Sequence, residues 1–145
     1  MNSDFVELLS LLQRFRVRYL LIGGYAVMYY AEPRYTKDID LFVDRSSDNV
    51  TEFAKCMEAF GFPLTAAQVE QFSQPNAMIA IGIPPGRIDF LNTVLGLEFK
   101  ECWPRAQEAD FHGVMVNVIS REDLIRAKKA VGRPQDLIDL EKLEK

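Results

Sequence analysis

A chain of 145 residues, 48% hydrophobic and 26% charged, is long enough to bury a sizeable core and has the composition of a soluble globular protein. Its net charge of −4 argues against nucleic-acid binding over the whole surface, but it leaves room for a local basic patch. No apolar run reaches the length of a membrane span, and the N-terminus lacks the basic start of a signal peptide. Cys56 and Cys102 show neither metal-ligand nor disulfide-framework spacing. We therefore expect a single cytoplasmic domain over residues 1–145.

The first half of the chain predicts alternating helices and strands. Apolar residues at helical spacing predict a helix over residues 3–15, and an apolar run predicts a strand over residues 18–22. Gly23-Gly24 ends this strand. Further elements are expected in the order of a short helix over 25–31, a strand over 38–43, and a helix over 48–60 with Asp48 as its cap and Gly61 as its stop.

The second half adds a hairpin, one more strand and two helices. Residues 77–83 and 87–91 are predicted to be strands joined by a turn at Pro84-Pro85-Gly86. A strand over 114–119 and a helix over 120–131, capped by Ser120, come next, and Pro134 suits the first turn of a last helix. This order predicts an α/β (α+β) fold, a small mixed β-sheet flanked by helices.

Two aspartates lie within the predicted strand of the segment RYTKDIDLFVD, residues 34–44. Strand alternation places Asp38 and Asp40 on one face, with Ile39 and Leu41 on the opposite, core-facing side. The two aspartates are separated by roughly 6.6 Å at the backbone, a gap that their side chains can close onto one small cation. Bound Mg2+ would remove their mutual repulsion. The alternative is a half-exposed strand whose acids are simply solvated.

Asp89, in the segment RIDFL, supplies a third carboxylate. Ile88 and Phe90 take one face of this strand, so Asp89 takes the other. If the strand pairs beside residues 38–40, the three acids converge. Three acids can hold two metal ions about 3.5–4 Å apart, the arrangement used in nucleotidyl transfer. Taken alone, Asp89 is also compatible with an ordinary exposed acid.

The pair Gly23-Gly24 stands between an apolar strand and a short helix. Glycine allows a backbone to approach a ligand closely, and the start of the next helix offers free N–H groups and a positive dipole end to phosphate. A tight turn without a ligand is the alternative for a lone glycine pair. Its position shortly before the paired aspartates favours the phosphate site.

Taken together, GGYAVMYYAEPRYTKDIDLFV resembles the signature of the DNA polymerase β-like nucleotidyltransferase superfamily, and most closely its small bacterial AbiEii-type and minimal members. The signature is a glycine pair, a helix, and then Arg-x-Thr-x-Asp-x-Asp, matched here by Gly23, Gly24, Arg34, Thr36, Asp38 and Asp40. Asp89 would be the family's third acid. The C-terminal segment DLIRAKKAVGRPQDLIDLEKL resembles a second family pattern, matched by Lys128, Gly132, Arg133, Pro134 and Asp136.

The resemblance implies a nucleotidyltransferase fold and attack of a hydroxyl on the α-phosphate of a nucleoside triphosphate, with pyrophosphate leaving. Asp38, Asp40 and Asp89 would bind one or two Mg2+ ions, for which Mn2+ can substitute. Asp89 would ligate the metal ion nearest the attacking hydroxyl and help to deprotonate that hydroxyl.

The nucleotide site implied by the resemblance comprises Gly23, Gly24, Arg34, Thr36, Lys128 and Arg133. Gly23 and the following helix would hold the triphosphate, and Lys128 and Arg133 would neutralise phosphate charge as pyrophosphate departs. Two roles remain open for Arg34: it neutralises phosphate charge, or it forms an ion pair with an acid. Two interpretations also remain open for the basic residues between Arg121 and Arg133, which form either an RNA-binding strip or a solvated helix face.

The leading hypothesis is a magnesium-dependent nucleotidyltransferase acting on an RNA or protein hydroxyl, as the toxin or antitoxin half of a bacterial two-component system. The competing hypothesis is a non-catalytic module that binds a nucleotide or a partner and has kept the fold. Presence of all three acids favours the enzyme, because a binding module can lose Asp89 without penalty. A plain α/β domain would require every motif position to coincide by chance.

Overall fold

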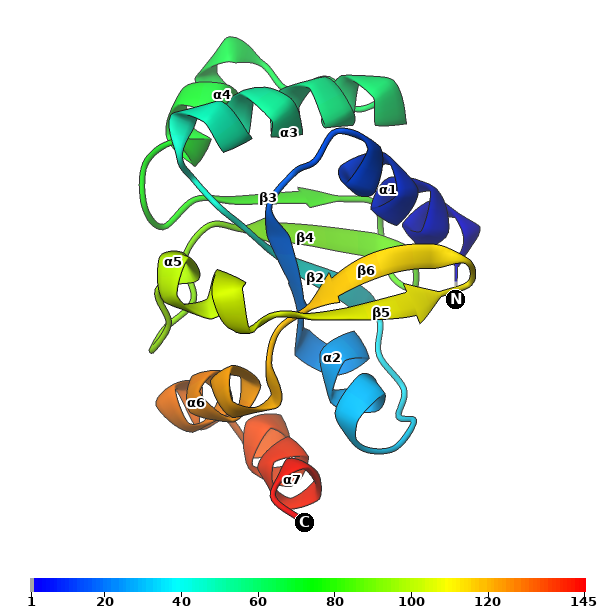
Figure 1. The fold of residues 1–145 in the computed structure, drawn as a ribbon, viewed down its shortest axis with the longest axis vertical. Helices are drawn as coiled ribbons and strands as arrows, with labels where there is room; N and C mark the ends of the chain where they lie inside the picture. Colours follow the sequence, from blue (N-terminus) through cyan, green and yellow to red (C-terminus); the bar gives the residue numbers. More distant parts are fainter. Residues whose placement is uncertain (1) are drawn as a thin grey trace.

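Six strands form one mixed sheet in the computed structural model, which describes residues 2–145 (Figure 1). The strands are β1 (Tyr19–Ile22), β2 (Asp38–Val43), β3 (Met78–Ile81), β4 (Arg87–Leu91), β5 (Gln107–Phe111) and β6 (Val114–Val118). The helices are α1 (Ser3–Arg14), α2 (Gly23–Tyr30), α3 (Ser47–Phe60), α4 (Ala66–Phe72), α5 (Phe99–Cys102), the short 3-10 helix η1 (Trp103–Arg105), α6 (Arg121–Val131) and α7 (Pro134–Leu143).

The strand order is β3-β4-β2-β1-β6-β5. β2 pairs with β4 and β1 with β6 in parallel, and the remaining neighbours pair antiparallel. β2 and β1 therefore lie at the centre of the sheet. Residue Asp40 of β2 is opposite Asp89 on one side and Ile22 on the other, which brings the chain segment after β1 and the strand β4 to the same place.

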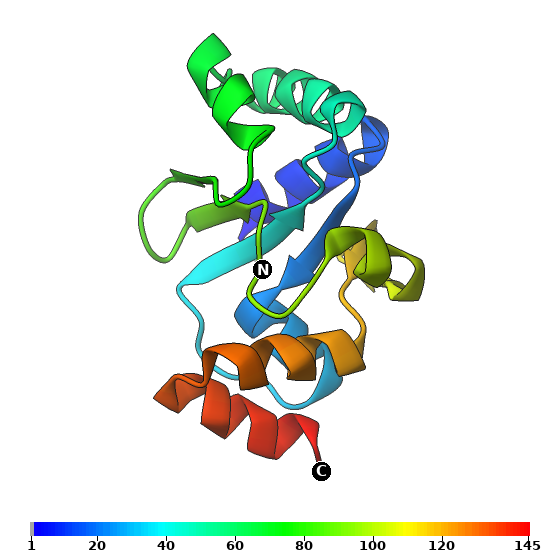
Figure 2. The same ribbon diagram turned by 90° about the vertical axis from the view of Figure 1, so that its left-hand side faces the viewer.

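Helices cover both sides of the sheet (Figures 1 and 2). α1, α3 and α4 lie on one side, where Phe53 of α3 packs against Phe72 and Phe90 with ring centroids 5.2 and 5.1 Å apart. α2, α6 and α7 lie on the opposite side and toward one end. Fully buried apolar side chains such as Leu41 and Phe90 fill the space between the sheet and α1, α3 and α4, and their burial stabilises the fold.

The predicted fold class is confirmed, and most predicted elements are present with boundaries shifted by a few residues. The β3–β4 hairpin, the left-handed Gly61 after α3 and the start of α7 at Pro134 all follow the local signals. α3 begins one residue earlier than expected, and its N-cap is Ser46 rather than Asp48. α2 begins at Gly23, so the glycine pair is the first turn of that helix.

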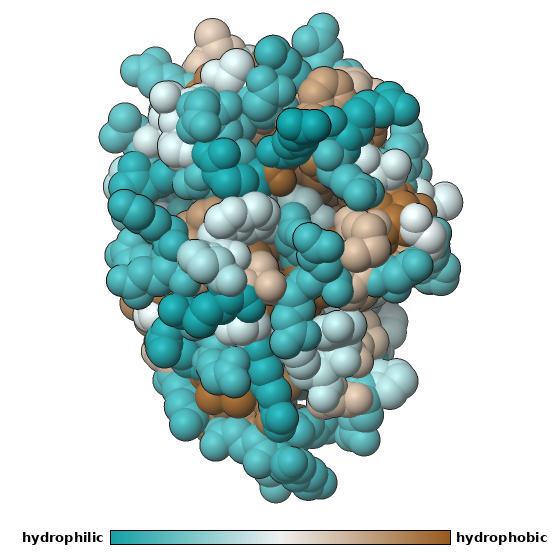
Figure 3. Space-filling model, in the orientation of Figure 1, coloured by the Kyte–Doolittle hydropathy of each residue, from teal (hydrophilic) through white to brown (hydrophobic). Residues whose placement is uncertain are grey.

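The face of β2 that carries the acids is less polar than strand alternation suggests. Phe42 shares this face, and it is 1% exposed because α5 lies over it, with the rings of Phe42 and Phe99 5.1 Å apart. Among residues 2–145, no helix is both long and apolar enough to cross a membrane. The face in Figure 3 is mostly hydrophilic, with small separated hydrophobic patches.

Candidate metal and nucleotide site

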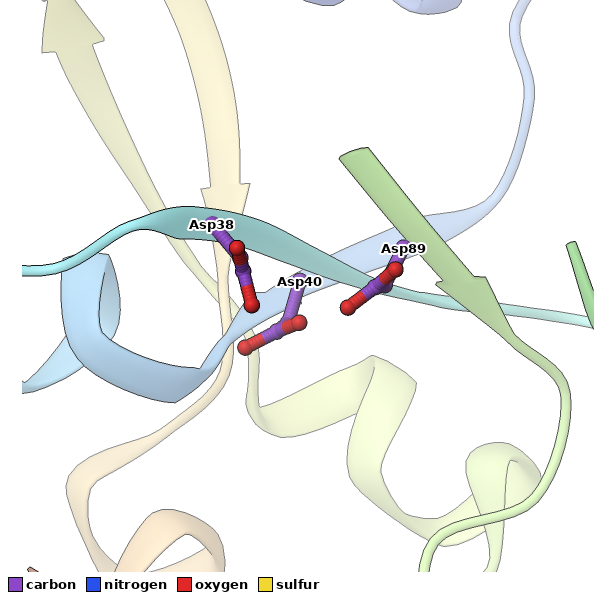
Figure 4. A group of neighbouring side chains, drawn as sticks. All are labelled: Asp38, Asp40 and Asp89. Atoms are coloured by element: carbon purple, nitrogen blue, oxygen red, sulfur yellow. The ribbon is translucent and has the colours of Figure 1, made fainter. Parts of the chain in front are cut away.

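Three carboxylates from two neighbouring strands meet on one side of the sheet. Asp38 and Asp40 project from β2 and Asp89 from β4, and Figure 4 shows all three pointing the same way. One oxygen from each lies within 4.8 Å of the other two. The parallel pairing of Asp40 with Asp89 fixes this arrangement through the backbone. The convergence expected from the sequence is therefore present.

Gly23 lies directly against the carboxylate of Asp40. It follows Ile22, the β1 residue opposite Asp40, and its φ of +68° is a conformation that favours glycine. A Cβ atom at this position would overlap Oδ2 of Asp40. Glycine is therefore needed here for the aspartate as well as for any ligand. The start of α2, which has no side-chain cap, directs free N–H groups to the same region.

The unligated acid cluster is electrostatically strained. Burial, and next the charges of Asp89 and Asp38, raise the pKa of Asp40 to about 7, and the positive charge of Lys128 opposes this rise. Oδ1 of Asp38 is buried and has no hydrogen-bond partner among the described residues. Asp89 accepts a 2.8 Å hydrogen bond from Nε of Arg87. A cation bound between the three carboxylates would relieve their mutual repulsion and would give Oδ1 of Asp38 a partner.

A cleft of about 350 Å³ opens beside the acids. Asp40, Asp89 and Gly23 line one part of it, and Lys128 and Arg133 line another. The rest of the lining is largely apolar and comprises Ile22, Met78, Leu91, Val94, Leu95, Ile119, Leu124, Ala127 and Val131, with Thr93 and Asp136 as its polar members. The cleft thus combines charged groups of both signs with an apolar lining, a composition typical of small-molecule sites.

Lys128 is a buried cation held by two buried acids. Its side chain is 10% exposed, and Nζ lies 3.0 Å from Oδ1 of Asp136 and 3.1 Å from Oδ2 of Asp139. Asp136 also caps α7 by accepting hydrogen bonds from the backbone N–H and Nε of Arg133. The guanidinium of Arg133 is far more exposed, at 71%. The two predicted phosphate-binding cations thus differ, one fixed and one exposed.

Arg34 and Thr36 lie beside the site without lining the cleft. Nη2 of Arg34 donates a 3.2 Å hydrogen bond to Oδ2 of Asp139. Nε lies 3.1 Å from Oδ1, close enough for an ion pair, but it makes no hydrogen bond among the described residues. Thr36 donates a 3.1 Å hydrogen bond to the backbone carbonyl of Asp38. Gly24 packs against both side chains. Of the two alternatives for Arg34, the structure shows the ion pair with an acid.

The basic segment between Arg121 and Arg133 is largely neutralised within the protein. Arg126, Lys128, Lys129 and Arg133 are each paired with an acid at 3.7 Å or less, whereas Arg121 has no acid partner among the described residues. Since most of these charges already have partners, the segment has the character of an internally paired helix face rather than of a free RNA-binding strip.

Sequence reasoning missed Asp139 and the apolar part of the cleft. Asp139 is completely buried, although it lies in a segment that reads as an ordinary amphipathic helix. One signal was available, because Asp136 and Asp139 are three residues apart and so share a helix face with Leu140 and Leu143. The apolar wall comes from separate segments that only the tertiary fold brings together.

The family assignment follows from a match over the whole chain. Residues 1–145 match the model of a family described as "Nucleotidyl transferase of unknown function (DUF2204)". The chain belongs to this family. No curated protein matches this nucleotidyltransferase in sequence.

Three crystal structures share the fold of this nucleotidyltransferase. Lincosamide antibiotic adenylyltransferase LnuA with lincomycin bound is 15% identical, with 99% of this chain and 96% of that chain covered and a TM-score of 0.58. ANT(2″)-Ia in complex with adenylyl-2″-tobramycin is 16% identical, with 97% and 86% covered and a TM-score of 0.62. An antigenic nucleotidyltransferase-like protein from Paracoccidioides brasiliensis is 16% identical, with 97% and 74% covered and a TM-score of 0.55. At these identities the likeness shows the fold.

Proposed function

We propose that this protein transfers a nucleoside monophosphate from a nucleoside triphosphate to an acceptor hydroxyl, using a metal site formed by Asp38, Asp40 and Asp89. The observation that carries the proposal is the convergence of these carboxylates, within 4.8 Å of one another, beside Gly23 and the uncapped start of α2. A carboxylate cluster next to a helix N-terminus suits a metal-bound polyphosphate, because the carboxylates can bind the metal ion while the helix N–H groups bind the phosphates.

The residues present fit one or two divalent cations. The donor set consists of carboxylate oxygens, the ligands that Mg2+ prefers, and Oδ1 of Asp38 is buried without a hydrogen-bond partner among residues 2–145. Mg2+, with Mn2+ as a substitute, would polarise the α-phosphate and favour ionisation of the acceptor hydroxyl. Asp38, Asp40 and Asp89 would hold the ions, and Arg87 orients Asp89 through its hydrogen bond.

The proposed reaction forms one bond and breaks one. The acceptor oxygen attacks the α-phosphorus, a new P–O bond forms, and the bond from the α-phosphorus to the α,β-bridging oxygen breaks, so pyrophosphate takes that electron pair. Asp89 assists removal of the hydroxyl proton, which passes to solvent. The N–H groups at Gly23 and the start of α2 bind the triphosphate, while Lys128 and Arg133 counter the charge of the departing pyrophosphate.

The acceptor expected from the resemblance is a hydroxyl of RNA or of a protein, including a cognate partner in a toxin–antitoxin pair of the AbiEii type. The paired charges of the 121–133 segment favour the protein over RNA. The crystal structures of the two adenylyltransferases carry lincomycin and adenylyl-2″-tobramycin, so a small-molecule hydroxyl is included as a third acceptor class. Residues 1–145 would act as a single domain.

The test is transfer of label from each of four α-³²P-labelled nucleoside triphosphates to cellular RNA, a co-expressed partner protein and a panel of aminoglycosides and lincosamides. We expect magnesium-dependent labelling of one class with wild type and none with Asp38→Asn or Asp40→Asn. Nucleotide binding without labelling of any acceptor would favour the non-catalytic binding module. Labelling that persists in both variants would contradict the proposed site.

A further inference from the structure

The glycine–arginine–threonine–aspartate motif divides into two groups by location. Gly23, Asp38 and Asp40 lie at the acid cluster. Gly24 and Arg34 instead form a packed unit with Thr36 next to it, since a Cβ on Gly24 would lie 2.8 Å from Oγ1 of Thr36 and 3.1 Å from Nη2 of Arg34. Half of the motif therefore contacts protein rather than the cleft.

This second group is connected to Lys128 through one buried carboxylate. Asp139 is 0% exposed, and its two oxygens contact Arg34 at 3.1 and 3.2 Å, Lys128 at 3.1 Å and Gln135 at 3.0 Å. Arg34 precedes β2, whereas Lys128 and Asp139 belong to α6 and α7. Asp139 thus connects the loop that precedes β2 with α6, the helix that carries Lys128 into the lining of the cleft.

Lys128 is held where a free lysine would not remain. A lysine side chain has several rotatable bonds, so fixing it in one position has a large cost in conformational entropy. Here two carboxylates within 3.1 Å restrain the ammonium while the residue lines the cleft. An ammonium has three N–H donors, so at least one is left for a ligand in the cleft.

We infer that Asp139 and Arg34 are positioning residues that hold the ammonium of Lys128 toward the phosphate groups of the nucleotide, and that Gly24 leaves the space that Arg34 occupies. The phosphate part of this inference rests on the proposed function, whereas the restraint of Lys128 does not. Arg34 acts through Asp139 and touches no substrate. Its guanidinium lies against both oxygens of Asp139, with one hydrogen bond from Nη2 at 3.2 Å and Nε 3.1 Å from the other oxygen. The single ammonium of a lysine does not reproduce this planar contact.

The first measurement is acylation of lysines by N-hydroxysuccinimidyl acetate at low reagent concentration, followed by peptide mass spectrometry. The reactivity of Lys128 is expressed relative to the exposed Lys129. In wild type Lys128 is protected, and Asp139→Asn is expected to raise its relative reactivity about tenfold or more, since a charge-assisted contact is worth roughly 1.5–3 kcal/mol. Unchanged protection of Lys128 in Asp139→Asn would overturn the inference.

The second measurement is calorimetric binding of α,β-methylene-ATP with Mn2+, a nucleotide whose α,β-bridge cannot be cleaved. Asp139→Asn is expected to raise the dissociation constant about tenfold or more, while binding of Mn2+ alone is unchanged. Exposure of Lys128 with unaltered nucleotide affinity would show that the restraint serves stability only, and would overturn the positioning role. If wild type binds no nucleotide, the proposed function fails, and the acylation result still decides whether Asp139 restrains Lys128.

Matched variants separate positioning from simple loss of a buried ion pair. Asp123 is also fully buried on α6 and accepts two 2.9 Å hydrogen bonds from Arg105, but it does not line the cleft. Asp123→Asn should destabilise the protein and leave both Lys128 protection and nucleotide affinity at wild-type values. If Asp139→Asn fails to fold, Arg34→Lys replaces it, because this variant keeps the positive charge and loses the planar guanidinium. Arg34→Lys is expected to lose part of the protection of Lys128 and part of the nucleotide affinity. Wild-type values of both in Arg34→Lys would contradict the inference.

Discussion

Gly23 has a structural reason to be glycine before any ligand is considered. Its left-handed φ costs a residue with a Cβ about 1 kcal/mol, and the added carbon would also displace the carboxylate of Asp40. A substitution at this position therefore disturbs the metal site itself. Loss of nucleotide binding in such a variant would not show that phosphate contacts the glycine backbone.

We expect Gly23→Ala to lower the free energy of unfolding by about 1–3 kcal/mol and to weaken Mn2+ binding at least tenfold. Urea denaturation and calorimetry measure the two effects. Gly113→Ala is the control, because Gly113 has φ +85° and nothing within 4 Å of an added Cβ. It should lose stability and keep metal affinity. Equal Mn2+ affinity in Gly23→Ala and wild type would contradict the contact with Asp40.

The raised pKa of Asp40 predicts a pH-dependent stability. Its folded-state pKa of about 7 lies above the unfolded value of 3.8, so the folded state retains a proton that the unfolded state has lost. Stability attributable to this group is complete below about pH 4 and is lost as pH rises to about 7. Without metal, Asp40→Asn should therefore be more stable than wild type at pH 8, by an amount on the order of a few kcal/mol, and nearly equal to it at pH 4.

Thermal melts of the metal-free protein across this pH range, with the exposed Glu7→Gln as control, measure the difference. Added Mg2+ should stabilise wild type at pH 8 and leave Asp40→Asn unaffected. If Asp40→Asn melts well below wild type at pH 8, Asp40 is required for the fold, and the claim that its ionised carboxylate destabilises the metal-free protein is wrong.

At the scale of elements, the acid site depends on the register of β2 and β4 and on the connections around them. Asn92, directly after β4, is 5% exposed; its side chain donates to the carbonyls of Phe72 and Gln74 and accepts from the N–H of Ala77. It thereby ties α4 to the hairpin that carries Asp89. Asn92→Ala leaves three backbone groups without partners.

We expect Asn92→Ala to cost about 2–4 kcal/mol in the free energy of unfolding, because unsatisfied buried polar groups cost about 1–3 kcal/mol each. Gln68→Ala removes one exposed hydrogen bond of the α4 capping box and should cost about 1 kcal/mol or less. Equal effects of the two substitutions in urea denaturation would contradict the role of Asn92.

Elements with strong local signals were predictable, and those set by tertiary contact were not. The strand over residues 38–43 and the helix from Pro134 follow from periodicity and proline placement. β5 was missed because its sequence QEADF has little strand propensity and pairs only at the sheet edge beside β6. The short helices α4 and α5 have too few residues to show an amphipathic period. The convergence of three acids was predictable because two carboxylates share one strand. The spacing of Asp136 and Asp139 places Asp139 on the apolar face of its helix, but its partners Arg34 and Lys128 come from other segments that only the tertiary fold brings together.

At the scale of the whole molecule, the cleft lies between the sheet and the C-terminal helices. Its floor is formed by β2 and β4, and Lys128 of α6 and Arg133 at the start of α7 form part of the opposite side. A nucleotide bound there would connect the two halves. At a concentration one hundred times its dissociation constant, it should stabilise the fold by about 2.7 kcal/mol and slow amide hydrogen exchange in α6 and α7. Exchange slowed only in α1 and α3 would place the ligand elsewhere.

If the three carboxylates bind a metal-complexed nucleotide, calorimetric titration of α,β-methylene-ATP will detect that binding and its dependence on each acid. The titration is made with Mn2+, with EDTA, and with Asp38→Asn, Asp40→Asn and Asp89→Asn. We expect wild type to bind the nucleotide with Mn2+, and we expect EDTA and each substitution to weaken this binding at least tenfold. Affinity that is equal in EDTA, or unchanged in all three variants, would contradict the proposed site.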